Sequence, residues 1–215
     1  MIVPATPVQP VPALEPVGVV PAAPASIAMA SDTTLKVRSE RLNVLENHLA
    51  SVTGTMFEGG RPAQPGRAVT LQALGARGWR TLDLAHTTSR GGFRLRYTPR
   101  SLGGAMLRLR FAGDALARPA RRRLGRLEVF RLAGASWYGG GGNLACGGEL
   151  TSSTLGVANK TLPCGTLVTL RYSGHTVRVP VIDRGPYVEG REFDLTEATK
   201  RALGFGDTGQ IWSTG

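Results

Sequence analysis

The stretch Met106-Leu107-Arg108-Leu109-Arg110-Phe111 alternates apolar side chains with arginine. Successive side chains of a β-strand point to opposite faces of a sheet, so this alternation predicts a strand with one buried and one solvated face. The pattern recurs at residues 93–97 and 68–74. Gly-Gly and Pro-Gly steps between such segments are typical of turns that join short strands. The sequence therefore predicts an all-β fold.

About seven short strands fit between residues 35 and 131, which predicts a two-sheet sandwich of the immunoglobulin type. Within this region, residues 52–55 and 65–71 resemble the immunoglobulin-like modules that bacterial surface proteins use as spacers. The first predicted domain is therefore an immunoglobulin-like β-sandwich at residues 35–131 with a spacer role.

The formal net charge of +11 is concentrated in this first part of the chain. Residues 1–131 hold 19 Lys and Arg against 8 Asp and Glu, whereas residues 132–215 hold seven of each kind. The excess follows the solvent faces of the predicted strands, at Arg94, Arg96, Arg108 and Arg110, and a cluster at Arg121, Arg122 and Arg123. Two interpretations stay open: charges that keep sheet edges from pairing, and a patch that binds an anionic wall polymer.

Nucleic acid is a weaker candidate partner, because no aromatic residues interleave with the arginines. No window of 18 apolar residues free of proline and charge is present, which argues against a transmembrane helix. The two cysteines form no Cys-x-x-Cys motif and His-Glu-x-x-His is absent, so we expect neither a metal site nor a cofactor.

Residues 1–34 are rich in proline and alanine and are predicted to be a disordered segment or the remnant of a signal peptide. Ala28-Met29-Ala30 matches an Ala-x-Ala cleavage site, but no basic segment precedes it and prolines interrupt the apolar run. A linker is the alternative. The sequence contains no lipobox cysteine near its beginning, so nothing predicts a lipid anchor.

Residues 132–215 form the second predicted domain. Strands are predicted at residues 166–172 and 176–182, joined by a tight turn around Gly174. A helix should follow, with Asp194 or Thr196 as its cap and Gly204 at its end.

Four motifs in this domain resemble the rare lipoprotein A family, over residues 135 to about 212. They are Ser136-Trp137-Tyr138-Gly139, Lys160-Thr161-Leu162-Pro163-Cys164-Gly165-Thr166, Asp183-Arg184-Gly185-Pro186-Tyr187 and Asp194-Leu195-Thr196, and they occur in the family's order. The resemblance implies a six-stranded double-psi β-barrel with a short helix, related in shape to expansins and to a family of endoglucanases.

The resemblance also implies a secreted or cell-envelope protein that acts on peptidoglycan glycan strands. Family members studied as enzymes are lytic transglycosylases, which cleave the bond between MurNAc and GlcNAc and leave a 1,6-anhydro end. A carboxylic acid must protonate the leaving oxygen, while the C6 hydroxyl of the sugar itself attacks C1. One acid can therefore suffice, where ordinary glycoside hydrolysis uses two carboxylates.

Two aspartates are the leading candidates for this acid. Asp183 ends an apolar strand and enters a Gly-Pro turn, and Asp194 matches the acidic residue in the groove of expansins and the related endoglucanases. The alternatives are structural: Asp183 would stabilise its turn, paired with Arg184 or Arg191, and Asp194 would cap the helix. Glu149, in a Gly-Glu pair like that of the enzymatic members, is a weaker candidate.

The predicted sugar contacts are aromatic and polar. Trp137, Tyr138 and Tyr187 could stack on sugar rings or belong to the core instead, and Arg184 and Asn159 are polar candidates. Asn159 stands where the enzymatic members have a histidine, and asparagine cannot shuttle a proton. The competing function is therefore a non-catalytic, expansin-like polysaccharide binder.

Cys146 and Cys164 lie 18 positions apart, the second inside the Lys-Thr-Leu-Pro motif. In an exported protein they are expected to form a disulfide bond, whereas two reduced thiols would indicate a cytosolic protein.

Overall fold

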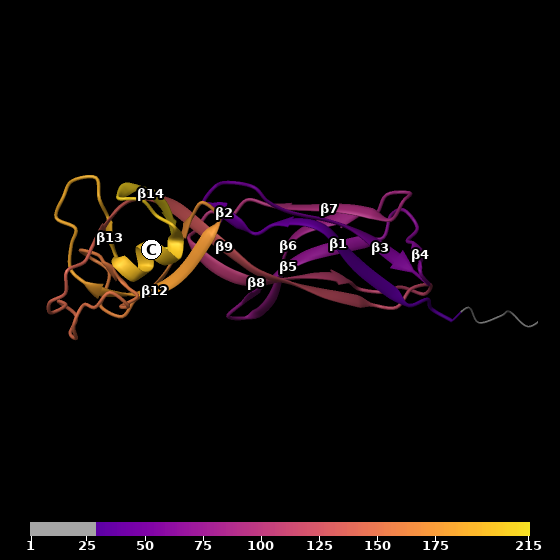
Figure 1. Cartoon of the computed structure of the whole chain (residues 1–215). Coiled ribbons are helices and arrows are strands. Elements are labelled where there is room, and N and C mark those ends of the chain that lie inside the picture. The colour runs from indigo at the N-terminus through magenta and orange to yellow at the C-terminus, as the bar shows by residue number, and fades with distance from the viewer. Residues whose placement is uncertain (1–28) are drawn as a thin grey trace, which may run out of the picture.

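The computed structural model describes residues 29–215, which form an elongated molecule with two lobes (Figure 1). Most of the predicted segment 1–34 lies outside the described residues, and its last two residues, Thr33 and Thr34, begin strand β1. Within residues 29–215, no helix combines the length and the apolar character that crossing a membrane requires.

The first lobe is a sandwich of two sheets. One sheet contains β1 (Thr33–Arg41), β3 (Ala50–Glu58), β4 (Arg61–Pro62) and β7 (Gly92–Tyr97), with β3 pairing with the other three. The second sheet runs in the order β6 (Gly78–His86), β5 (Ala68–Gly75), β8 (Gly103–Phe111), β9 (Ala120–Tyr138), and β2 (Asn43–Leu45) also pairs with β9.

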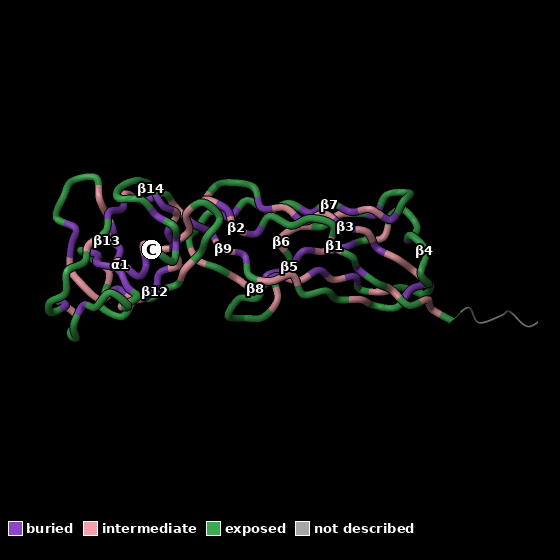
Figure 2. Tube along the Cα trace, in the orientation of Figure 1, coloured by how far each residue is buried: buried purple, intermediate pink, exposed green. Residues whose placement is uncertain are grey.

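The sandwich core follows the alternation seen in the sequence. On β8, Leu107, Leu109 and Phe111 are buried, while Arg108 and Arg110 face the other side of the sheet. Figure 2 shows buried and more exposed residues alternating along the strands of both sheets. The prediction of an all-β fold is confirmed, with the short strands β2 and β4 in addition to the expected ones. The immunoglobulin-like character of this lobe stays a prediction.

The second lobe is a closed barrel of six strands. From the end of β9 the order is β13 (Phe193–Thr196), β10 (Val157–Ala158), β12 (His175–Asp183), β11 (Leu167–Tyr172) and β14 (Thr208–Ser213), and β14 pairs again with β9. The β9–β13 and β10–β12 pairs are parallel. Phe193, Leu195 and Ile211 are fully buried inside. The predicted six-stranded barrel is confirmed.

Helix α1 (Glu197–Leu203) packs beside the barrel, and its cap resolves the choice that the sequence left open. Thr196 is the N-cap residue, and its hydroxyl accepts a hydrogen bond from the backbone N–H of Thr199 at 3.3 Å. Gly204 ends the helix in the left-handed conformation, with φ of 63°, as helix ends often do. Asp194 is therefore free of the capping role.

Strand β9 connects the lobes without a linker. Over its 19 residues it pairs first with β8 and β2, and then with β14 and β13. The predicted domain boundary after residue 131 falls inside this strand and stays a prediction. At the junction, the rings of Phe130 and Trp212 lie 5.8 Å apart. A continuous strand and a packed aromatic pair should hold the lobes in one orientation.

Candidate active site

Four residues on four neighbouring strands of the barrel, including Asp183 and Asp194, are paired with one another in a row. Ser136 on β9 is paired with Asp194 on β13, Asp194 with Ala158 on β10, and Ala158 with Asp183 at the end of β12. Ala158 is thus paired with both aspartates and separates them across the sheet, with a register shift in the β10–β12 pairing between Val157 and Ala158. The two aspartates are eleven positions apart in the sequence.

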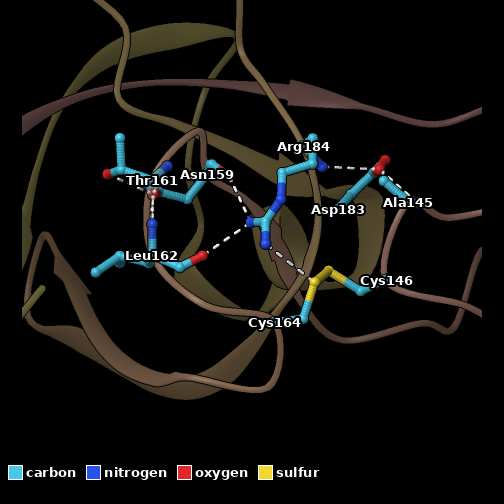
Figure 3. Close-up of a disulfide and its surroundings, with 8 residues drawn as sticks. All are labelled: Ala145, Cys146, Asn159, Thr161, Leu162, Cys164, Asp183 and Arg184. Atoms are coloured by element: carbon cyan, nitrogen blue, oxygen red, sulfur yellow. Dashed lines mark hydrogen bonds between the residues drawn. A yellow bond between two sulfur atoms is a disulfide. The ribbon is translucent and has the colours of Figure 1, made fainter.

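Asp183 uses one of its carboxylate oxygens to hold the surrounding turns. Its Oδ1 accepts hydrogen bonds from the backbone N–H groups of Ala145, at 2.9 Å, and Arg184, at 2.8 Å. Figure 3 shows the carboxylate pointing away from the Arg184 guanidinium. Among the described residues Asp183 has no ion pair, so the pairing with Arg184 or Arg191 that the sequence left open is not formed.

Asp194 is held by a neutral partner. Its Oδ1 accepts a hydrogen bond from the Ser136 hydroxyl, and no Lys or Arg in residues 29–215 forms an ion pair with it. The side chain is half-buried. Asp183 and Asp194 thus each have one held oxygen and one that makes no hydrogen bond within the described part of the chain.

Tyr138 lies two residues beyond Ser136 on the same strand, next to both carboxylates. Burial, followed by the nearby negative charges of Asp183 and Asp194, raises the pKa of the Tyr138 phenol well above its usual value. The hydroxyl therefore keeps its proton at any physiological pH. It is buried, yet it finishes without a hydrogen-bond partner in the described structure. Buried polar groups usually have partners, so such a hydroxyl marks a place where a ligand group could bind.

Arg184 and Asn159 support the loop at residues 159–164. The Arg184 guanidinium donates to the carbonyl oxygens of Asn159, at 3.0 Å, and Leu162, at 2.8 Å, and to Cys164 Sγ at 3.1 Å (Figure 3). The Asn159 amide accepts from the N–H groups of Thr161 and Leu162 and donates to the carbonyl of Glu192. Asn159 is only 6% exposed. Their predicted contacts with substrate remain predictions.

The two other predicted aromatic contacts differ in their surroundings. The Lys200 ammonium covers one face of Trp137, 3.9 Å from the ring centroid, and the indole N–H donates to Asp207. Hydrogen bonds from Lys200 and then Trp137 lower the pKa of Asp207. Tyr187, in contrast, is 80% exposed directly after the Gly-Pro turn. The Lys160 ammonium lies over the Tyr187 ring at 5.9 Å from its centroid, a looser contact than that of Lys200 with Trp137.

The disulfide between Cys146 and Cys164 is present, as expected for an exported protein. It ties the loop that carries Ala145, an N–H donor to Asp183, to the Lys-Thr-Leu-Pro motif. Glu149 is exposed and is bridged through its backbone to Asn143, and its catalytic role stays a prediction. Within residues 29–215, His, Cys, Asp and Glu side chains form no group of three that could hold a metal ion.

Thr199 and Gly156 also support the row, although the sequence analysis did not select them. The fully buried Thr199 hydroxyl donates to the Gly156 carbonyl at 2.9 Å and accepts from the Gly156 N–H at 3.0 Å. A Cβ on Gly156 would lie 2.3 Å from Ile182 Cδ1, so glycine is needed for this close approach. These contacts fasten the segment before Ala158 to helix α1.

A comparison with known families matches residues 132–212 to the double-psi β-barrel family described as lytic transglycolase. The closed six-stranded barrel lies in the same residues. The barrel domain is therefore similar to this family, and the match covers less than half of the chain.

Curated relatives of the family share this part of the chain. A probable endolytic peptidoglycan transglycosylase RlpA from Aquifex aeolicus is 43% identical over 75 residues, which is 33% of this chain and 33% of the relative. A protein of the same name from Synechocystis is 36% identical over 124 residues, 51% of this chain and 36% of the relative. The chain thus matches about a third of the length of these relatives. Among solved structures, the Streptomyces papain inhibitor aligns with a TM-score of 0.33 and 25% identity, covering 40% of this chain and 92% of the inhibitor.

Proposed function

We propose that the protein is an extracytoplasmic lytic transglycosylase that cleaves peptidoglycan glycan strands. The similarity of residues 132–212 to the RlpA-like family supports the reaction class, and the relatives' names refer to endolytic peptidoglycan transglycosylases. The disulfide supports a location outside the reducing cytosol. The observation that carries the proposal is the pair of aspartates on either side of Ala158. Within residues 29–215 neither has a cationic partner, and both lie near the Tyr138 hydroxyl, which has no hydrogen-bond partner there.

The reaction breaks one bond and forms one. The acid transfers its proton to the glycosidic oxygen, so that the bond from C1 of MurNAc to this oxygen breaks and GlcNAc leaves with a free hydroxyl. The C6 hydroxyl oxygen of the same MurNAc then bonds to C1, and its proton passes to a carboxylate. The product is a 1,6-anhydro ring. No water is consumed and no electrons are transferred, so the two carboxylates account for all the proton movements.

Asp194 is the proposed acid and Asp183 the proposed base. A hydroxyl can donate or accept a hydrogen bond, so Ser136 can follow Asp194 through both its protonated and its ionised form. Backbone N–H groups only donate, and Asp183 Oδ1 accepts two of them, which suits a group that acts as an acceptor. Tyr138, which keeps its proton, would donate to the sugar between the two carboxylates.

Digestion of purified sacculi tests this proposal. The wild-type protein should release muropeptides with 1,6-anhydro ends, detected by mass spectrometry, and Asp194→Asn and Asp183→Asn should each abolish the release. Glu189→Gln, a loss of negative charge on an exposed loop of the same domain, is the matched control and should keep full activity. Activity in both Asn variants would refute the assignment, and loss only in Glu149→Gln would move the acid to Glu149.

A second candidate function is a non-catalytic, expansin-like binder of wall polysaccharide. Asn159 favours it, because this residue stands where enzymatic family members have a histidine and its amide makes three hydrogen bonds to backbone groups. This function predicts that the wild type and Asp194→Asn sediment equally with sacculi and release no product. Product release by the wild type would exclude it.

A further inference from the structure

Four arginines form a compact group on the outer face of the sandwich, far along the chain from the aspartate row. Arg110 on β8 is directly opposite Arg121 on β9, and Arg108 is directly opposite Arg123. Opposite residues have Cβ atoms about 5 Å apart, and residues two apart along a strand are separated by about 7 Å. These residues, here called the arginine face, therefore place four guanidinium groups within one small area.

The positive charge of the arginine face is not neutralised. Within residues 29–215, none of its four members forms an ion pair, whereas Arg67, Arg118, Arg126 and Arg131 each have an acidic partner. Glu128 on the same strand is bound by Arg126, and Glu40, which lines a shallow groove with Arg123, is in no ion pair. Like charges directly opposite each other destabilise a sheet. The group therefore leaves a local positive charge at which an anion could bind.

Arg108 is held in place before any ligand arrives. Its Nε–H donates to Gln72 Oε1 at 2.9 Å, and its guanidinium lies over the Trp79 ring, 4.0 Å from the centroid. Gln72 is itself 8% exposed and donates to Thr81. Desolvation, then the charges of Arg121 and Arg110, lower the pKa of Arg108, which agrees with the close grouping. Because the Arg108 side chain is already fixed, it loses less conformational entropy on binding an anion than a mobile arginine would.

The chemistry of the face selects among anions. Arginine presents a planar fork that matches phosphate oxygens in pairs, and residues 1–131 contain 18 arginines and one lysine. Single-stranded nucleic acids also need aromatic faces on which bases stack. The arginine face is thus suited to the phosphate charges along a polymer backbone, and one face of its neighbouring ring, Trp79, is already used by Arg108.

We propose that the arginine face binds a linear polymer whose repeating units are joined by phosphodiester groups and carry no bases, such as a polyol phosphate. Neighbouring phosphates would each bridge a pair of opposite arginines across β8 and β9. The site lies on the sandwich, so it would hold the protein on such a polymer while the barrel remains free. This inference is independent of the proposed function, because binding is measured without any turnover.

The test uses the full chain with poly(glycerol phosphate) as the probe, and follows binding by fluorescence anisotropy over a series of salt concentrations. Arg110→Gln combined with Arg121→Gln should weaken binding by about tenfold, and should reduce the slope of log K against log salt by about 2. The same double variant should unfold at a temperature no lower than the wild type, because a like-charge pair is removed.

The matched control is Arg94→Gln combined with Arg96→Gln. These exposed arginines lie on β7 in the opposite sheet, where they face Thr53 and Ser51 rather than other arginines, and the charge change is identical. The control should lose less than about twofold in affinity. Equal losses in both double variants, or no binding by the wild type, would overturn the proposal. Tighter binding of a single-stranded DNA of equal charge would overturn the choice of polymer.

Discussion

Replacing Tyr138 by phenylalanine should make the protein more stable and, at the same time, less active. The hydroxyl is buried beside Asp183 and Asp194 and makes no hydrogen bond with any residue from 29 to 215. The folded protein therefore bears the cost of removing it from water without the compensation of a partner. Phenylalanine keeps the ring and its packing and removes only this hydroxyl, so the substitution separates a polar role from a stacking role.

The sizes of both effects follow from this environment. An unpaired buried hydroxyl costs about 1–3 kcal/mol in proteins, and we expect the lower end, about 1 kcal/mol, because Tyr138 is only partly buried. In a chain of this size such a gain raises Tm by about 2–4 °C. If the hydroxyl donates to the sugar in the transition state, its loss should slow turnover by about 10- to 100-fold, the range for hydrogen bonds that involve charge.

Thermal unfolding followed by circular dichroism and the release of anhydro-muropeptides from sacculi measure the two effects. Tyr187→Phe is the control, because this tyrosine is 80% exposed and its hydroxyl can always reach water. It should change neither Tm nor turnover. A lower Tm for Tyr138→Phe would mean that the hydroxyl has a partner in the folded protein. Unchanged turnover would assign the residue to ring stacking and refute the polar role.

Three further predictions concern stability. Replacing Cys146 and Cys164 together by serine should lower the free energy of unfolding by about 3 kcal/mol, because the bridge closes a segment of 18 residues, and an unchanged guanidinium midpoint would contradict this. Thr199→Val leaves the Gly156 N–H without its acceptor, so it should lower the free energy of unfolding by about 1–3 kcal/mol. Thr199→Ser keeps the hydroxyl and should lower it by less. A larger loss in Thr199→Ser would refute the role of the hydroxyl. The lowered pKa of Asp207 means that its contacts stabilise the fold above the unfolded carboxyl pKa and that this contribution is lost as the pH falls through the lower folded value. Asp207→Asn should therefore have a lower Tm than the wild type at neutral pH but not in acid. A Tm difference of the same size in acid would contradict the stabilising role of the ionised carboxylate.

Local patterns in the sequence were sufficient for the elements and for the barrel. Alternation along residues 93–97 and 106–111 predicted strands that the structure contains. Successive side chains of a strand point to opposite faces, so a buried and a solvated face appear in the sequence as alternating apolar and polar residues. The order of four short motifs predicted a double-psi barrel, and the observed six strands close on themselves through β9 and β13. The helix end at Gly204 followed from its conformational freedom.

Other features depend on which strands become neighbours, and local patterns do not contain that information. Asp183 and Asp194 are brought to either side of Ala158 because β10, from an earlier part of the chain, inserts between β12 and β13. The predicted choice of helix cap also needed the structure, which uses Asp194 for Ser136 and leaves the cap to Thr196.

By itself, the sequence determined the all-β class, the motif-bearing barrel, the candidate acids and the concentration of positive charge in residues 1–131. Only the tertiary structure decided that the Tyr138 hydroxyl, unpaired within the described residues, lies near two carboxylates and that Arg110 stands opposite Arg121. The periodicity of the sequence specifies the face of a strand on which a side chain lies, because the alternation of faces follows from the extended backbone of that one strand. Register and strand order specify what that side chain meets, and these arise from packing between segments that are distant in the sequence.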